Sequence, residues 1–339
     1  MNNPARHLAG QRLMLGFDGT QFNSDLETII NRFQAGGIIL FRRNIVSPDQ
    51  VARLCADAQA CAASCGQPPL FIAVDQEGGA VSRLPAPFTQ FDGNPQIHTR
   101  EQAIAFARVT ARELKDVGIN MNLAPVLDVV SDHSDSIMKT RAFPGDARTV
   151  TDLGITVIQT LQSCGVMAVA KHFPGIGRTV LDSHHLLPVL DVDLTDLQAA
   201  DLVPFEAAVR ADTTGIMVSH IFCPRLDPQW QASLSVTIAR DLIRQNLGFN
   251  GLVLTDDLDM KAIHHDMDTC MDRILASEID LALICHPGPN IEKAFDALVR
   301  RLEADQETWD RGGASQERIY RYKGRYLGWN PTARSVSGG

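Results

Sequence analysis

The chain has 339 residues, 45% of them hydrophobic and 21% charged, a composition typical of one folded domain with a substantial core. Its net charge of −9, without a clustered basic face, argues against a nucleic-acid partner. The sequence has no signal-like N-terminal apolar segment and no apolar run of membrane-spanning length, and its seven cysteines show no zinc-ligand spacing. We therefore expect a cytoplasmic protein without a membrane partner, metal or cofactor.

Apolar runs recur along the chain, and each ends in polar or charged residues where a strand would meet its loop. The runs are continuous rather than alternating, which is typical of parallel strands buried on both faces. Eight strands are expected, at residues 12–17, 37–41, 70–74, 119–124, 166–170, 215–219, 252–255 and 281–285.

Helical patterns lie between these runs, and several begin with a recognisable N-terminal cap. Ser24 opens a capping box. Ser47 precedes Pro48, which suits the first position of a helix. Thr99 and Thr195 give the same start signal for later helices. Strands and helices are therefore expected to alternate along the chain.

Eight strand-then-helix units indicate an α/β fold, a single-domain (β/α)₈ TIM barrel. We expect this catalytic domain to cover residues 1–329 and to be followed by a disordered tail at residues 330–339. A doubly wound open sheet is the alternative. It would require a glycine-rich phosphate-binding turn after an early strand, and residues 16–19 (GFDG) lack that spacing.

Polar residues follow the predicted strands at the end where the loops of a barrel meet. They include Asp75, Lys171, His172, His220, Asp256 and Asp257. Two predicted loops, at residues 125–148 and 172–194, are longer than compact domains usually contain. Such loops are typical of lids and binding segments.

The second long loop contains an Asp-x-His pair, Asp182 and His184. In an extended segment the residues i and i+2 project to the same side, so Asp182 could accept the Nδ1 proton and leave Nε2 aimed into a pocket. An isolated triplet of this kind is more often a turn with a solvated histidine. Its position in a long loop favours an acid/base pair.

Five motifs occur in order: residues 72–79 (IAVDQEGG), 122–128 (NLAPVLD), 171–175 (KHFPG), 182–184 (DSH) and 255–257 (TDD). Together they resemble the signatures of glycoside hydrolase family 3, and within it the single-domain β-N-acetylhexosaminidases of bacterial cell-wall recycling. The resemblance implies a retaining exo-β-N-acetylglucosaminidase. Its substrate would be terminal non-reducing N-acetylglucosamine on β-linked muropeptide fragments, cleaved by double displacement through a covalent glycosyl-enzyme.

The resemblance also implies catalytic roles. Asp256 would be the nucleophile, and His184, assisted by Asp182, the general acid/base. Retaining glycosidases normally use two carboxyl groups. A histidine suits the second role because its unperturbed pKa lies near neutral pH. Asp257 is a competing nucleophile, although neighbouring residues of a strand face opposite ways and at most one should be well placed.

Sugar-binding roles are implied for Asp75, Arg83, Arg141, Lys171 and His172. These are the charged and bidentate groups expected around sugar hydroxyls and an acetamido carbonyl. The chain departs from the family pattern after the KHFPG motif, where Ile176 and Arg178 replace a histidine and an aspartate. We expect these departures to affect substrate preference and the loop more than the class of reaction.

Three other functions stay open on the sequence alone. The first is phosphorolysis, because a neutral histidine acid/base would not repel an incoming phosphate. The second is a metal-dependent barrel hydrolase that uses His172, His184, His220 and Asp256 as ligands. The third is a non-catalytic sugar-binding protein, which the presence of both candidate catalytic groups disfavours.

Overall fold

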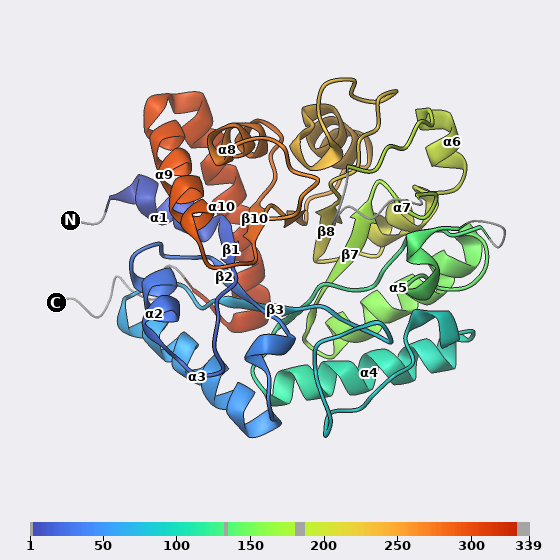
Figure 1. Cartoon of the computed structure of the whole chain (residues 1–339), viewed down its shortest axis with the longest axis horizontal. Coiled ribbons are helices and arrows are strands. Elements are labelled where there is room, and N and C mark those ends of the chain that lie inside the picture. Colours follow the sequence, from blue (N-terminus) through green and yellow to red (C-terminus); the bar gives the residue numbers. More distant parts are fainter. Residues whose placement is uncertain (1–2, 132–134, 180–186, 331–339) are drawn as a thin grey trace.

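Eight parallel strands close into a barrel in the computed structural model, which describes residues 3–131, 135–179 and 187–330. Around the barrel the strand order is β1-β10-β9-β8-β7-β6-β3-β2, and helices surround the strands (Figure 1). This arrangement confirms the predicted (β/α)₈ fold. The predicted disordered tail lies, from residue 331 onward, outside the described residues.

Each predicted apolar run overlaps one barrel strand. The strands are β1 (Leu13–Leu15), β2 (Gly37–Leu40), β3 (Phe71–Val74), β6 (Met121–Asn122), β7 (Met167–Phe173), β8 (Gly215–Val218), β9 (Leu252–Asp257) and β10 (Leu281–Ile284). Two strands continue past their predicted ends, so that β7 includes His172 and β9 includes Asp256. A short antiparallel hairpin, β4 (Gln76–Gly78) and β5 (Val81–Ser82), follows β3.

Helical segments fill the connections between strands. They are α1 (Pro4–Gln11), α2 (Ser24–Asn31), η1 (Arg42–Asn44), α3 (Pro48–Ser64), η2 (Asn94–Gln96), α4 (Arg100–Asp116), η3 (Ile137–Thr140), α5 (Ala147–Ser163), α6 (Leu194–Ala199), α7 (Val203–Arg210), η4 (Ala232–Leu234), the π-helical η5 (Val236–Asn246), α8 (Met267–Ala276), α9 (Pro289–Ala304) and α10 (Gln306–Leu327). In the part of the chain that the structure describes, no helix is long and apolar enough to cross a membrane.

Two of the four predicted N-terminal caps are confirmed. The side chains of Ser47 and Thr99 accept backbone hydrogen bonds at the starts of α3 and α4. The other two predictions were wrong. Asn23, not Ser24, caps α2, and Asp193 caps α6, so that Thr195 lies inside the helix. Asn and Asp accept these bonds as well as Ser and Thr do, so a cluster of such residues leaves the helix start uncertain by one or two positions.

The strands bury both faces, and alternate residues enter two separate apolar layers. Outward-facing residues such as Ile38 and Ile72 pack beneath the surrounding helices. Inward-facing residues such as Met14, Phe71 and Leu254 fill the barrel. The barrel interior is therefore a packed core, and a cavity can form only where this core ends.

Helix α10 packs against the end of the barrel where the strands begin. Ile319 and Tyr322 of this helix join the apolar layer inside the barrel. The buried Lys323 Nζ donates to Gln11 Oε1 at 2.8 Å and lies 5.1 Å from the centre of the Phe71 ring. With this end covered, the opposite end, where the strands finish, can hold a site.

Candidate active site

Three charged side chains reach the C-terminal end of the barrel because they continue the inward-facing phase of their strands. In β3, β7 and β9 the residues that face the barrel interior occur at every second position. The next inward-facing position, two residues beyond the last inward-facing apolar residue of each strand, is occupied by Asp75, Lys171 and Asp256 respectively. The apolar core thus gives way to a charged layer.

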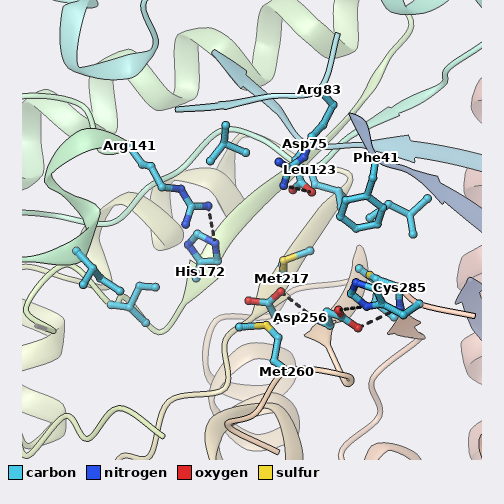
Figure 2. A pocket seen from close by; sticks show the side chains of 17 residues that line it. Phe41, Asp75, Arg83, Leu123, Arg141, His172, Met217, Asp256, Met260 and Cys285 are labelled. Atoms are coloured by element: carbon cyan, nitrogen blue, oxygen red, sulfur yellow. Dashed lines mark hydrogen bonds and ion pairs between the residues drawn. The ribbon is translucent and has the colours of Figure 1, made fainter. Parts of the chain in front are cut away.

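A pocket of about 290 Å³ opens at this layer (Figure 2). Five of the predicted site residues line it, namely Asp75, Arg83, Arg141, His172 and Asp256. Apolar side chains that include Leu123, Met217, Met260 and Leu283 form much of the remaining wall. The pocket therefore combines a few charged groups with an apolar lining, as small-molecule sites generally do.

A continuous network of ion pairs holds the charged residues on one side of the pocket. Lys171 is buried, and its Nζ lies 2.6 Å from Asp75 Oδ1 and 2.7 Å from Glu77 Oε1. Glu77 in turn accepts two hydrogen bonds from Arg141, of 2.9 Å from Nε and 2.7 Å from Nη2. Each cation has an anionic partner, so the network is fixed before any ligand binds.

Glu77 is the most deeply buried carboxylate of this network. Burial alone would raise its pKa, but Lys171 and Arg141 outweigh that effect and lower the pKa of Glu77 to about 2. Burial likewise opposes the charged forms of both cations, and their carboxylate partners reverse this, so that the pKa values of Lys171 and Arg141 are raised. All three groups are therefore ionised across the physiological pH range.

His172 is held from both sides of its ring. Its Nδ1 lies 2.8 Å from Asp128 Oδ2, and its Nε2 lies 3.3 Å from Arg141 Nη2. Because a guanidinium can only donate, Nε2 accepts here and Nδ1 carries the proton that is given to Asp128. Asp128 is fully buried, and its other oxygen accepts the backbone N–H of Ile176 at 2.7 Å.

Asp256 lies across the pocket from Arg141 and His172, next to Met260 (Figure 2). Its Oδ1 accepts the backbone N–H of Asp257 at 2.8 Å. Burial pushes the pKa of Asp256 upward, but His220, His172, the backbone N–H of Asp257 and the Lys171 ammonium together lower it by more, so that the pKa lies below its ordinary value. Asp256 is thus an ionised carboxylate facing the pocket.

Asp257 also lines the pocket, but its carboxylate bonds the protein backbone. Its Oδ1 accepts two backbone hydrogen bonds, from Asp259 and Cys285, each of 3.0 Å. Burial, together with the charges of Asp259 and Asp256, raises the pKa of Asp257 to about 6. This carboxylate ties the end of β9 to the end of β10 and ionises less readily than its neighbour.

Arg83 makes the weakest contact among the predicted binding residues. Its Nη2 is 3.8 Å from Asp75 Oδ2, and its side chain is 29% exposed. The guanidinium carbon also lies 5.5 Å from the centre of the Phe41 ring, a cation–π distance. Arg83 therefore sits at the rim, where it can adjust to a ligand.

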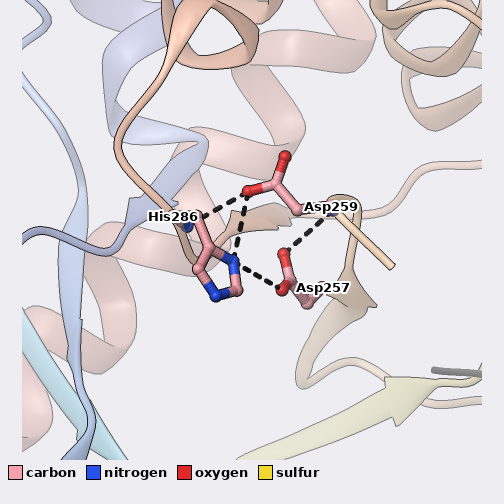
Figure 3. Close-up of side chains that lie close together, drawn as sticks. All are labelled: Asp257, Asp259 and His286. Carbon is pink, nitrogen blue, oxygen red and sulfur yellow. Dashed lines mark hydrogen bonds and ion pairs between the residues drawn. The ribbon is translucent and has the colours of Figure 1, made fainter. Parts of the chain in front are cut away.

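The structure does not support the metal-ligand set that the sequence left open. Both ring nitrogens of His172 and of His220 already bond protein groups, and His184 lies outside the described residues. Across residues 3–131, 135–179 and 187–330, one group of side chains brings metal-binding atoms within 4.8 Å of one another (Figure 3). It consists of Asp257, Asp259 and His286 at the pocket rim.

The predicted acid/base pair cannot be placed in the same way. Asp182 and His184 both fall within residues 180–186, outside the described part of the chain. Their roles therefore stay predictions. The departures at Ile176 and Arg178 are described: Ile176 lines the pocket, and Arg178 pairs with the buried Asp201 at 2.7 Å.

Sequence reasoning missed two residues that organise the site. The motifs at residues 72–79 and 122–128 contain Glu77 and Asp128, but the sequence predicts no site role for either residue. Glu77 follows Asp75 by two positions, and both end up bonded to Lys171. That spacing was a usable signal for Glu77. Asp128 reaches His172 across 44 positions of sequence, and no local pattern indicates this contact.

Comparison with known proteins places the chain in a family. The family model described as "Glycosyl hydrolase family 3 N terminal domain" matches residues 7–322. A curated relative named "Beta-hexosaminidase", from Pseudomonas aeruginosa, is 35% identical over 295 residues, which covers 85% of this chain and 86% of that protein.

Solved structures agree with this assignment. A glycoside hydrolase family 3 β-N-acetylglucosaminidase from Paenibacillus sp. str. FPU-7 is 34% identical and superposes with a TM-score of 0.91, covering 98% of this chain and 65% of that one. A β-N-acetylhexosaminidase from Beutenbergia cavernae is 27% identical with a TM-score of 0.87, covering 95% and 99% respectively. The chain belongs to glycosyl hydrolase family 3 and is a glycosidase.

Proposed function

We propose that this chain is a retaining exo-β-N-acetylglucosaminidase. Asp256 acts as the nucleophile, and His184, oriented by Asp182, acts as the general acid/base. The observation that carries the proposal is the position of Asp256: an ionised carboxylate that faces a pocket whose other side carries fixed charged donors. A sugar ring in this pocket would present its anomeric carbon to that carboxylate.

The reaction follows the double-displacement scheme. Asp256 attacks the anomeric carbon while His184 protonates the leaving oxygen, and a covalent glycosyl-enzyme forms. His184 then takes a proton from water, and the hydroxide oxygen displaces Asp256. A carboxylate with a lowered pKa suits the first step because the nucleophile must be deprotonated when the substrate arrives.

Asp256 is a better nucleophile than Asp257 on two grounds. Asp256 continues the inward-facing phase of β9, whereas Asp257 does not. One oxygen of Asp257 is also engaged by two backbone N–H groups, and the pKa of this residue is raised to about 6. Asp257 is therefore assigned the structural role of joining β9 to β10.

Asp75, Arg83, Arg141, Lys171 and His172 are assigned to sugar binding. The first reason is their position in or directly behind the pocket wall. The second is that the ion-pair network fixes Asp75, Arg141 and Lys171 before binding, which lowers the entropic cost of orienting a substrate. Such groups suit sugar hydroxyls and an acetamido carbonyl.

The substrate is assigned as terminal N-acetylglucosamine on β-linked peptidoglycan fragments, cleaved in the cytoplasm by a catalytic domain of residues 1–329. The names of the similar proteins support an amino sugar. All seven cysteines are free thiols, which is compatible with a reducing compartment. The muropeptide part of the assignment rests on the motif resemblance.

The test is to incubate the purified chain with a chromogenic N-acetyl-β-D-glucosaminide and with the matching β-D-glucoside, each with and without phosphate. Asp256→Ala serves as the inactive control. Release from the N-acetylated substrate alone, independent of phosphate, supports the proposal. Strict dependence on phosphate would make the chain a phosphorylase, and silence of the wild-type chain on this substrate and on muropeptide fragments would refute the proposal.

A further inference from the structure

His220 is a fully buried histidine that the proposed chemistry does not use. It follows β8, at the end of the barrel where the pocket lies. Its Nδ1 lies 2.7 Å from the hydroxyl of Ser233, which is also fully buried in η4. Its Nε2 lies 2.8 Å from the backbone carbonyl oxygen of Asp257. These contacts place the imidazole between β8 and the end of β9.

The hydrogen-bond partner of Nε2 shows that this nitrogen of His220 carries a proton. A carbonyl oxygen can only accept, so Nε2 of His220 carries a proton and donates it to Asp257. The Ser233 hydroxyl can donate to Nδ1 and select this tautomer. The backbone N–H of Ser233 is itself bonded to the Ser219 carbonyl at 3.1 Å, so the serine is held in place.

Asp257 connects His220 to Asp256, the proposed nucleophile. The backbone N–H of Asp257 donates to Asp256 Oδ1 at 2.8 Å. The carbonyl of Asp257 accepts both His220 Nε2 and the backbone N–H of Met260, the latter at 3.1 Å. The carbonyl and the N–H of Asp257 belong to two peptide groups that share its Cα. A shift of the Asp257 backbone after loss of the His220 contact therefore also displaces the N–H, and the carboxylate of Asp256 loses a partner that fixes its rotamer.

We propose that His220 is a positioning residue for the nucleophile: by donating Nε2–H to the Asp257 carbonyl, it fixes the backbone of Asp257, whose N–H holds the Asp256 carboxylate. The inference rests on the proposed function only for the role of Asp256 as nucleophile. The contact chain from Ser233 through His220 and Asp257 to Asp256 is a property of the fold. A small displacement of a reacting atom lowers the rate steeply, so loss of this contact should slow the glycosylation step.

Two amide variants separate the two ring nitrogens. The side-chain amide of His220→Gln can reach the place of Nε2 and keep the donor to Asp257. The shorter amide of His220→Asn reaches the place of Nδ1, so it can keep the Ser233 contact but loses the one to Asp257. A role in packing alone predicts similar effects for both variants, whereas a positioning role predicts different ones.

The kinetic readout is the single-turnover rate of glycosyl-enzyme formation, measured together with KM. We expect His220→Asn to lower this rate by about 10- to 100-fold with KM within about three-fold of wild type, and His220→Gln to stay within about five-fold of wild type. His7→Asn is the matched control. His7 is a partly buried histidine of α1 that bonds Gln34 and Tyr320, away from the pocket, and its replacement should leave the glycosylation rate unchanged.

Residue-resolved exchange of the Asp257 amide hydrogen gives a readout that needs no substrate. His220→Asn should speed this exchange, and His220→Gln should not. Equal rates in wild type and His220→Asn, or equal losses in the Asn and Gln variants, would overturn the positioning role. If the wild-type chain hydrolyses no N-acetylglucosaminide, the proposed function fails, but the exchange experiment still decides whether His220 holds this peptide.

Discussion

The buried carboxylate of Glu77 holds the guanidinium of Arg141 through two hydrogen bonds, of 2.9 Å from Nε and 2.7 Å from Nη2. The same carboxylate lies 2.7 Å from Lys171 Nζ. Glu77 does not line the pocket, yet it fixes two of the cations assigned to sugar binding. The geometry of the binding side therefore depends on a residue that the sugar would not touch.

Glu77→Gln tests this dependence. The substitution leaves the positive charges of Lys171 and Arg141 only partly compensated, and breaking a buried ion pair typically costs about 3–5 kcal/mol. We expect the free energy of unfolding, from urea titration, to fall by about 3 kcal/mol. We also expect KM for the N-acetylglucosaminide to rise by about ten-fold or more as Arg141 shifts, where each ten-fold corresponds to about 1.4 kcal/mol.

Glu113→Gln provides the matched control for that variant. Glu113 accepts hydrogen bonds from the backbone and hydroxyl of Thr89 and does not line the pocket. This variant should keep the wild-type KM. A wild-type KM in Glu77→Gln as well would show that the ion-pair network does not orient the binding residues.

Asp257→Asn should change how stability depends on pH. The pKa of Asp257 is raised to about 6 in the folded protein, from an ordinary value of 3.8, chiefly by burial. Between these values the folded state keeps a proton that the unfolded state loses, so stability falls as pH rises through this window. The asparagine amide of the variant cannot ionise, so its stability does not fall in this way.

The expected size follows from the two pKa values, since a difference of one is worth about 1.4 kcal/mol. Between pH 4 and pH 7 the unfolding free energy of Asp257→Asn, relative to wild type, should shift by about 2 kcal/mol in favour of the variant, because part of the change already lies below pH 4. Thermal or urea unfolding at the two pH values measures this. A difference that does not change with pH would mean that Asp257 is ionised normally in the folded protein.

His184→Ala should reveal the general acid through the leaving group. A sugar leaving group needs protonation, and a positioned acid typically contributes about 10²- to 10⁴-fold. A dinitrophenyl leaving group needs little protonation, because it is already stable as an anion. We expect the variant to lose much more activity on a disaccharide than on the dinitrophenyl glycoside, with kcat/KM as the measurement. Equal losses on both substrates would remove His184 from this role.

Removal of divalent ions should leave activity unchanged. The proposed reaction uses a carboxylate and a histidine, and the ring nitrogens of His172 and His220 bond protein groups. The rim group of Asp257, Asp259 and His286 takes no part in it. Initial rates before and after treatment with a chelator test this. Activity that disappears with the chelator and returns with a divalent ion would contradict the mechanism.

Local sequence patterns predicted the barrel well because each strand carries its own apolar run and polar end. Residues i and i+2 of a strand face the same side, so the inward-facing apolar residues also predict that Asp75, Lys171 and Asp256 face inward. Helix starts were less certain, as Ser24 and Thr195 show, because neighbouring side chains compete to cap the same helix.

The contacts between elements could not be predicted in this way. The bond from Arg141 to Glu77 spans 64 positions, and the bond from His220 to the carbonyl of Asp257 spans 37. Each depends on how segments that end or follow different barrel strands meet at the end of the barrel. The sequence therefore indicated five residues that line the pocket, whereas the structure was needed to see which residues hold them.

Trapping the glycosyl-enzyme would show which carboxylate is the nucleophile. The chain would be incubated with an activated N-acetylglucosaminyl donor, fluorinated on the ring so that the intermediate hydrolyses slowly, and the labelled peptide sequenced by mass spectrometry. We expect one N-acetylhexosaminyl adduct on Asp256, present in Asp257→Asn and absent in Asp256→Ala. An adduct on Asp257, or turnover of the donor without any covalent adduct, would contradict it.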